Sequence, residues 1–273
     1  MFVKRVSELK ITHTRFNCQL LSCFLSKTEG QQLTKYFGPA DLDETKEFVL
    51  KCGRPNTNGL VESKEIKFLE RAREKECSNF IVTIIASIEN IFPIDCCIIM
   101  EKALCDLQYF LDVELPEPTV GFLKHMELFF TNVLKFLEAE KIVYCDWKFE
   151  NILVFSKDFR ADSIKLCDFG SIQTAKVQIK NPKNFNVLFT SPYLAVDDMI
   201  TPTCEDDWIS VCFMFLKLAG KQLPWEITTA GKNKQLVYSQ VLFLKLSDTA
   251  AINFRQGIYW PDNNKFFELN KYI

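Results

Sequence analysis

The hydrophobic pattern of this chain changes character near residue 100, and this change constrains the fold more than any other feature of the sequence. Before it, apolar, β-branched and aromatic residues form short runs separated by turn residues, which is typical of strands. These runs are 16–24, 32–37, 46–52, 80–88 and 96–100. Between them, 62–76 combines many charges with one apolar stripe at helical spacing, so a single mostly solvated helix is predicted there.

Beyond residue 116 the pattern is helical. Apolar residues recur at i, i+3 and i+4 from Phe122 to Leu137, and 207–218 is apolar on all sides, which predicts a central helix. We therefore expect an α+β fold in which a small sheet plus one helix precedes a mainly helical lobe. A crevice between two such lobes is a common place for a ligand.

Composition narrows the classes of function. The 33 Lys and Arg nearly balance the 35 Asp and Glu over 273 residues, so neither a nucleic acid nor a membrane is expected as a direct partner. No uncharged apolar stretch reaches the length of about 18 residues that a membrane span needs. Residues 1–12 carry charges without the apolar core of a secretory signal, so a location inside the cell, in cytoplasm or nucleus, is expected.

Zinc and histidine chemistry have little material in this chain. The 11 cysteines form no C-x-x-C pair, and several lie inside apolar runs, which favours reduced, buried thiols. His13 and His125 are the only histidines of the sequence, so a metal cluster or a histidine-based triad is not expected.

The residues with the clearest chemistry lie in the segment Tyr144-Cys145-Asp146-Trp147-Lys148-Phe149-Glu150-Asn151, which is followed downstream by Asp168-Phe169-Gly170. This ordered set resembles the H-R-D-L-x-x-x-x-N and D-F-G motifs of the eukaryotic-type protein kinase superfamily. The resemblance implies a two-lobed kinase fold, with the N-lobe at 1–102 and a shortened C-lobe at 103–273. It also implies ATP and Mg²⁺ as cofactors.

The resemblance assigns a role to each of these side chains. Asp146 would orient the substrate hydroxyl and accept its proton, and Lys148 would offset the negative charge that grows on the γ-phosphate. Asn151 and Asp168 would be the metal ligands, because Mg²⁺ prefers hard oxygen atoms.

Upstream segments match the nucleotide-binding half of the same family. Phe48-Val49-Leu50-Lys51 is similar to the V-A-I-K strand, and Glu65 stands on the predicted helix where kinases place the carboxylate partner of that lysine. Backbone groups of Glu101 and Ala103 would bind adenine. Asp106 would contact the ribose, and a helix N-cap is an equally good interpretation of this residue.

The hairpin that covers the phosphates departs from the family. Where kinases have G-x-G-x-x-G-x-V, this chain has 26–33, in which Gly30 and Leu33 remain as the nucleotide-contacting positions. Fewer glycines let the backbone approach phosphate less readily, so weaker nucleotide binding is expected.

Downstream segments extend the resemblance to 225. They are 189–197, similar to the end of an activation segment, 207–210, similar to the D-x-W-S start of the central helix, and 220–225, similar to G-x-x-P-F. Lys148 and Thr190 are the residues typical of Ser/Thr kinases, so a protein substrate with a Ser or Thr acceptor is implied. Ser171, Thr174 and Ser191 are candidate phosphorylation sites of the activation segment, and solvated loop hydroxyls are the simpler interpretation.

Two alternatives to a Ser/Thr protein kinase remain. A pseudokinase that binds nucleotide or acts as a scaffold would explain the poor glycine loop and the loss of the motif arginine at Cys145. A small-molecule kinase would share the fold but would lack the 190–197 segment. We favour the enzyme, because a scaffold has no chemical reason to keep the complete set of charged residues.

The chain is also similar to kinases encoded by large DNA viruses, including baculovirus-like ones, in its short length and degraded glycine loop. Few residues follow Trp225, so a homodimer or another partner that covers the shortened C-lobe is expected.

Overall fold

The structure is a computed structural model, and it divides into two compact units, Met1–Leu104 and Cys105–Ile273, which are described separately. The described residues are 19–23, 48–52, 64–75, 77–91, 94–115, 117–158, 163–181, 186, 188–194, 198–220, 223 and 225–226. The expected strand at 32–37 and the expected shortening of the chain after Trp225 lie outside them.

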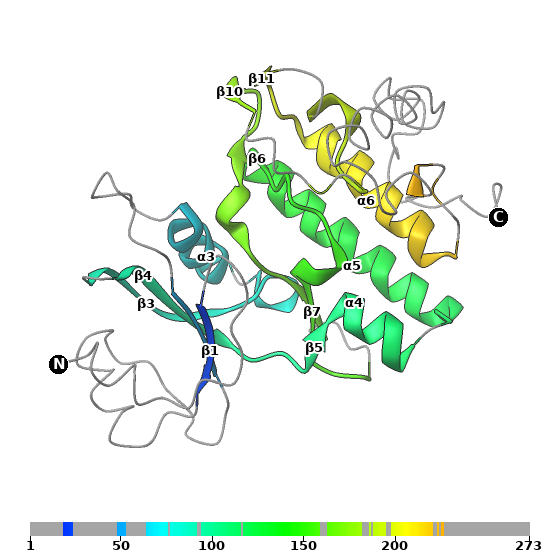
Figure 1. Ribbon diagram of the computed structural model, residues 1–273, viewed down its shortest axis with the longest axis horizontal. Coiled ribbons are helices and arrows are strands. Elements are labelled where there is room, and N and C mark those ends of the chain that lie inside the picture. Colours follow the sequence, from blue (N-terminus) through cyan, green and yellow to red (C-terminus); the bar gives the residue numbers. More distant parts are fainter. Residues whose placement is uncertain are drawn as a thin grey trace. The chain divides into compact units, whose positions relative to one another are not determined.

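The first unit is built on a four-stranded antiparallel sheet. Its strands are β1 (Gln19–Cys23), β2 (Phe48–Cys52), β3 (Ile84–Ile91) and β4 (Ile94–Glu101). Their order in the sheet is β1-β2-β4-β3, so neighbours in the chain pair except where β4 lies between β2 and β3 (Figure 1). The strand predictions at 16–24, 46–52, 80–88 and 96–100 are confirmed, with bounds shifted by a few residues.

Helix α3 (Lys64–Glu74) belongs to the same unit, as the apolar stripe predicted. Ile66, Phe68, Leu69 and Ala72 recur on one face and are buried, and the helix packs on β3. An acid in the first turn, Glu65, and basic residues in the last turn complement the helix dipole. The helix is thereby positioned by its apolar face while most of its charges stay exposed.

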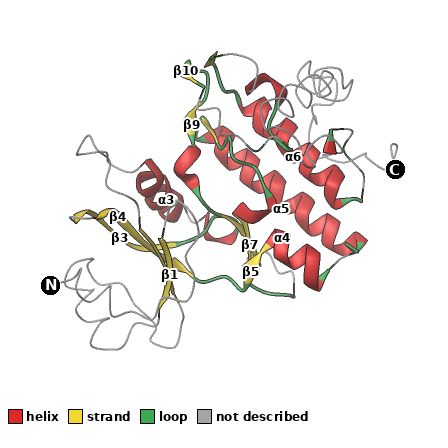
Figure 2. Cartoon of the chain, in the orientation of Figure 1, coloured by secondary structure: helices red, strands yellow, loops and turns green. Residues whose placement is uncertain are grey.

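Two long helices form the frame of the second unit, and they pack against each other (Figure 2). Helix α5 (Val120–Ala139) begins at the N-cap Thr119, whose hydroxyl accepts a hydrogen bond from the Phe122 N–H. Helix α6 (Cys204–Leu218) is buried continuously over 206–215, so its prediction as a central helix is confirmed.

Short strands and one short helix complete the second unit. Helix α4 (Leu107–Tyr109) continues into a π-helical turn at Phe110–Glu114. The strands form one three-stranded sheet of order β5-β7-β8 and two isolated pairs, β6 with β9 and β10 with β11. Their bounds are β5 (Cys105–Asp106), β6 (Ile142–Val143), β7 (Ile152–Val154), β8 (Ile164–Leu166), β9 (Gln173–Thr174), β10 (Ile179–Lys180) and β11 (Met199–Ile200).

An aromatic cluster lies at the centre of the second unit. The Tyr144 ring contacts Trp147 and Phe169 edge-on, with centroids 5.1 and 5.4 Å apart, and Trp147 contacts Phe130 of α5 at 6.0 Å. Each such contact adds about 0.5–1.5 kcal/mol to the burial of the rings. The segment between β6 and β7 is therefore anchored to helix α5 of the core.

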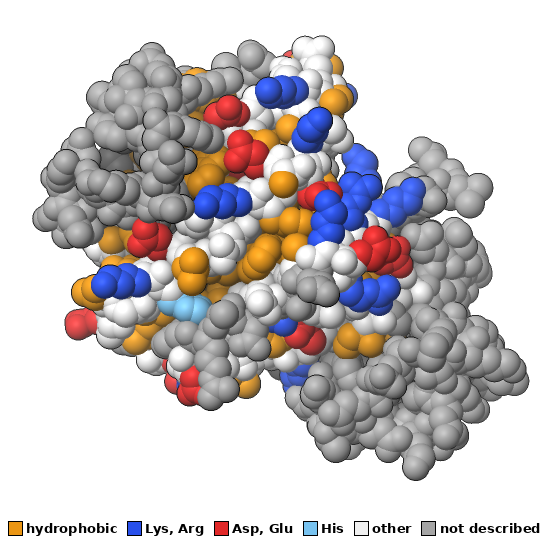
Figure 3. Space-filling view, turned by 180° about the vertical axis from the view of Figure 1, so that it is seen from behind, with side chains coloured by type: hydrophobic (Ala, Val, Ile, Leu, Met, Phe, Trp, Pro, Cys, Tyr) orange, Lys and Arg blue, Asp and Glu red, His pale blue; other side chains and the backbone are white. Residues whose placement is uncertain are grey.

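The described surface mixes hydrophobic, acidic and basic side chains on the face that Figure 3 shows, in agreement with the nearly balanced charge. Cys77, Cys105, Cys145, Cys167, Cys204 and Cys212 carry free thiols. Within the described part of the chain, no helix has both the length and the apolar character needed to cross a membrane.

Candidate active site

In the first unit, Lys51 and Glu65 form an ion pair. Lys51 lies on β2, where β1 and β4 flank it, and Glu65 lies in the first turn of α3. The Lys51 Nζ atom donates to both carboxylate oxygens of Glu65, at 2.8 and 2.9 Å, and the two side chains are 14% and 9% exposed. Such a two-oxygen contact, largely shielded from water, holds the ammonium group in one place.

In the second unit, the backbone just before Asp146 is held by a buried carboxylate of α6. Asp207 accepts the N–H of Tyr144 at 2.6 Å and the N–H of Cys145 at 3.1 Å, one on each oxygen. Burial raises the pKa of Asp207 to about 7, against the opposing effect of these two hydrogen bonds. Cys145 has φ 66°, in the left-handed region that non-glycine residues rarely adopt, so these bonds stabilise an unfavourable turn.

This turn brings three of the predicted site residues together. Lys148 Nζ donates to Asp146 Oδ2 at 2.6 Å. Asn151 Nδ2 donates to the Asp146 backbone oxygen and to Asp146 Oδ2, each at 2.9 Å. Asp146 therefore has one oxygen fixed by an ammonium and an amide, which orients the carboxylate.

Asn151 and Asp168 lie at the same end of the β7–β8 pair, because the two strands are antiparallel. Asn151 directly precedes β7, Asp168 is the second residue after β8, and the Cys167 N–H between them donates to the Asn151 backbone oxygen at 2.9 Å. Asp168 adopts the left-handed conformation, with φ 59° and ψ 71°. The Asn151 amide nitrogen donates to Asp146, which leaves the side-chain carbonyl oxygen as the atom that could bind a metal ion. The carboxylate of Asp168 and this amide oxygen are of the ligand types that Mg²⁺ takes, and the ion usually completes its shell with phosphate and water.

Tyr144 replaces the histidine of the family motif and links the turn before Asp146 to the segment that contains Asp168. Its hydroxyl donates to the Cys167 backbone oxygen at 2.5 Å, next to Asp168. Burial raises the pKa of Tyr144 well above its usual value, so the phenol stays a protonated donor.

Cys145 replaces the motif arginine and lies in an apolar cluster. With Val143 it is buried against Leu194 and Ile200, and Ala175 and Ile179 pack on the same cluster. Leu194, Ile200, Ala175 and Ile179 all belong to the segment after Asp168. Cys145 therefore contacts this segment through apolar packing, at the motif position where kinases have an arginine. Burial raises the pKa of the Cys145 thiol, so it stays neutral.

The residues predicted to bind adenine and ribose have structural partners. The Glu101 carboxylate accepts the N–H of Thr83 at 2.7 Å, and Ala103 is half-buried just after β4. Asp106 Oδ1 accepts the N–H of Tyr109 at 2.9 Å, so the N-cap interpretation of this residue holds. Gly30 and Leu33 lie outside the described residues. The convergence of Lys51 with Asp146 and Asp168 in one cleft stays a prediction.

Two features of this site were missed by the sequence reasoning. Asp207 was noted only as part of a motif, although an aspartate at the start of an apolar helix is a signal for a buried acceptor. Ser191 was interpreted as a solvated hydroxyl, and this is wrong, because its residue is 0% exposed and its hydroxyl donates to Asp206. Ser171 is half-buried and Thr174 is exposed.

Comparisons with known proteins identify the family. Residues 40–265 match the family described as Protein kinase domain. The chain is 32% identical over 118 residues to serine/threonine-protein kinase SBK1 of Danio rerio, an alignment that covers 42% of this chain and 29% of that protein. It is 28% identical over 231 residues to serine/threonine-protein kinase dkf-2 of Caenorhabditis briggsae, covering 80% of this chain and 18% of that protein. The chain thus spans less than a third of the length of either relative.

A solved structure shows the same fold. The crystal structure of the yeast RNA Pol II CTD kinase CTDK-1 complex aligns with a TM-score of 0.55 at 20% sequence identity, covering 72% of this chain and 61% of that chain. The expected α+β protein kinase fold is confirmed by this match and by the family match. With more than half of its residues matched, the chain belongs to the protein kinase domain family.

Proposed function

We propose that this chain is a Ser/Thr protein kinase that transfers the γ-phosphate of ATP to protein hydroxyls. The observation that carries the proposal is the polar network of the second unit, in which Lys148 and Asn151 orient the Asp146 carboxylate, while the residue before Asp168, Cys167, is hydrogen-bonded to Asn151. The Lys51–Glu65 ion pair supports it independently, because both residues of the pair are retained and in contact.

In the proposed reaction, the oxygen of a Ser or Thr hydroxyl forms a bond to the γ-phosphorus. The bond from that phosphorus to the β,γ-bridging oxygen breaks, ADP leaves, and the hydroxyl proton passes to Asp146. Lys148 offsets charge on the transferred group, and Lys51 holds the α- and β-phosphates. Mg²⁺ bound to Asn151 and Asp168 would neutralise the phosphate oxygens.

Substrate type and location rest on family reasoning. Lys148 and Thr190 favour Ser and Thr over Tyr, and both curated relatives are named serine/threonine-protein kinases. Backbone groups of Glu101 and Ala103 with the Asp106 side chain form the proposed adenosine contacts. We further propose that the enzyme acts on protein substrates inside the cell, in cytoplasm or nucleus. An origin in a large DNA virus stays a prediction.

The test is transfer of radiolabelled phosphate from ATP to a generic basic protein, followed by analysis of the phosphorylated amino acid. Asp168→Asn and Lys51→Met are each expected to lower transfer by at least about a hundredfold. Asp158→Asn and Lys124→Met are matched controls, because both residues are exposed and lie outside the site. Phosphotyrosine as the product would contradict the Ser/Thr assignment, and unchanged transfer in Asp168→Asn would contradict the enzyme.

A thermal-shift measurement separates the enzyme from the pseudokinase. ATP with Mg²⁺ should raise the unfolding temperature, because a ligand that binds only the folded state stabilises it. Such a shift without any phosphate transfer would favour the pseudokinase that binds nucleotide.

A further inference from the structure

Ser191 is tied to the start of α6 by a buried hydrogen-bond network. Its hydroxyl donates to Asp206 Oδ1 at 2.7 Å, and its N–H donates to the Ser210 hydroxyl at 3.2 Å. The Ser210 hydroxyl in turn donates to the Asp206 backbone oxygen at 2.8 Å, one turn earlier in the helix. Both polar groups of Ser191 that can donate are therefore satisfied by α6.

Asp206 is built to accept this bond. Its second oxygen accepts from the N–H of Thr203 at 2.9 Å and from the Thr203 hydroxyl at 3.0 Å, in the manner of a capping box. A carboxylate in the first turn of a helix is also stabilised by the helix dipole. Asp206 is 1% exposed, and its carboxylate accepts three hydrogen bonds, one from Ser191 and two from Thr203. The carboxylate therefore holds the Ser191 hydroxyl in a fixed position.

The neighbouring carboxylate on α6 binds a different segment. Asp207 holds the N–H groups of Tyr144 and Cys145, directly before the catalytic-loop residue Asp146. Two consecutive residues of one buried helix thus bind the catalytic loop and the segment that contains Ser191. A regular helix cannot change the distance between consecutive residues, so the two segments are held at a fixed separation.

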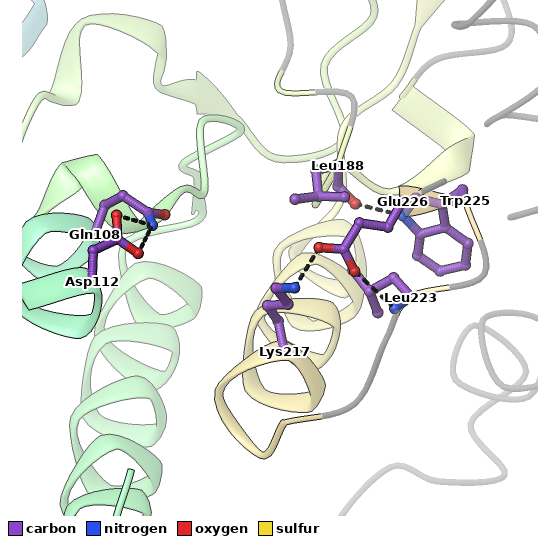
Figure 4. Close-up of polar contacts among 7 residues, drawn as sticks. All are labelled: Gln108, Asp112, Leu188, Lys217, Leu223, Trp225 and Glu226. Carbon is purple, nitrogen blue, oxygen red and sulfur yellow. Dashed lines mark hydrogen bonds and ion pairs between the residues drawn. The ribbon is translucent and has the colours of Figure 1, made fainter. Parts of the chain in front are cut away.

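Two further contacts secure the same segment at its other end. The Trp225 indole N–H donates to the Leu188 backbone oxygen at 2.8 Å (Figure 4). The Phe189 ring packs on Phe149, which lies between Lys148 and Asn151, with centroids 5.1 Å apart. The segment 188–191 is thus held by the Trp225 indole and the Phe149 ring in addition to α6.

We propose that Ser191 and Asp206 are positioning residues for the peptide substrate, which fix 188–194 relative to Asp146 through α6. The proposal rests on the proposed kinase function and deepens it. Neither residue touches the reacting atoms. Because the two Ser191 bonds run to α6 and not to the residues assigned to ATP, loss of the link is expected to affect the peptide and to leave the binding of ATP unchanged.

The first test is steady-state kinetics of Ser191→Ala with a Ser-containing basic peptide. Loss of one hydrogen bond to a buried carboxylate lowers kcat/KM for the peptide by about tenfold, while KM for ATP stays as in the wild type. Thr174→Ala is the matched control, because it removes the hydroxyl of an exposed residue in β9, outside 188–194. Equal kcat/KM in Ser191→Ala and wild type would overturn the proposal, and so would an equal fall in the control.

The second test does not depend on activity. Hydrogen–deuterium exchange of 188–194 is expected to become about tenfold faster in Ser191→Ala, because the Tyr193 N–H also loses its contact with the Ser191 hydroxyl. Exchange in 142–146, held by Asp207, should stay unchanged and serves as the internal reference. Unaltered exchange in 188–194 would overturn the positioning role.

Asp206→Ala removes both acceptor oxygens and provides an independent variant. Since both substitutions break the same link, adding Ser191→Ala to Asp206→Ala should cause no further loss in kcat/KM or protection, whereas additive losses would contradict the link. If the wild type transfers no phosphate, the proposed function fails, and the exchange measurement alone decides whether Ser191 holds the segment.

Discussion

Asp207 and Tyr144 are 63 residues apart in the sequence, yet Asp207 Oδ2 accepts the Tyr144 N–H at 2.6 Å. Asp207 is 2% exposed, and its other oxygen binds the next backbone N–H of the loop. The position of Asp146 thus depends on an ionisable group that the helical core keeps out of water. This arrangement has a measurable consequence for stability.

We expect the free energy of unfolding of the second unit to fall as pH rises from about 4 to about 7. The pKa of Asp207 is about 7 in the folded chain, while an aspartate in the unfolded chain has its ordinary pKa of about 3.9, so in this window the folded state binds the proton that the unfolded state has released. The change attributable to Asp207 is on the order of 4 kcal/mol, fully developed above pH 7.

Urea unfolding followed by tryptophan fluorescence at several pH values measures this change. Asp207→Asn is the matched variant, because it cannot ionise, and the difference between variant and wild type isolates the contribution of Asp207. Parallel pH profiles for the two proteins would contradict the prediction.

Glu65→Gln is expected to destabilise the first unit by about 1–3 kcal/mol, because it leaves the Lys51 ammonium largely buried with only a neutral acceptor. The variant should also bind ATP more weakly, since Lys51 is no longer held in place. Denaturant unfolding and ATP titration measure the two effects. Glu74→Gln, an exposed change at the end of the same helix, should leave both unchanged. Equal behaviour of the two variants would rule out a role for the ion pair.

Tyr144→Phe is expected to lower the stability of the second unit by about 1–2 kcal/mol, because the Cys167 oxygen loses its donor while the ring contacts remain. Since the phenol stays protonated, the loss should be the same at pH 6 and pH 8. Urea unfolding at both pH values gives the two differences. A loss confined to one of them would mean that another titrating group is responsible.

Trp225→Phe is expected to lower the free energy of unfolding by about 1 kcal/mol, because it removes the N–H donor to Leu188 and keeps an aromatic ring against Phe213. Trp225→Ala removes the ring as well and should cost about 3–5 kcal/mol. Urea midpoints of the two variants and the wild type decide the order. If both variants cost the same, the indole N–H contributes nothing beyond packing.

The sequence alone determined the features that depend on local spacing and on residue chemistry. The apolar stripes of α3 and α5 predicted these two helices, because a helix buries residues that recur every three or four positions, and the apolar character of 207–218 on all sides predicted α6 as a central helix. The motif residues around Asp146 and Asp168 predicted a kinase, because their types and order match the chemistry of phosphate and metal binding.

The tertiary structure decided which polar residues are buried and what they bind. Ser191 precedes Pro192 in a segment predicted as a loop, and only the approach of α6 turns it into a buried donor to Asp206. Asp106 was predicted as a cap or as a ribose contact; helix α4 shows one oxygen of its carboxylate at the cap, and the ribose contact stays a proposal. Cys145 gains its apolar neighbours from a segment far along the chain. Such pairings depend on how distant elements pack, and no local periodicity of the sequence encodes them.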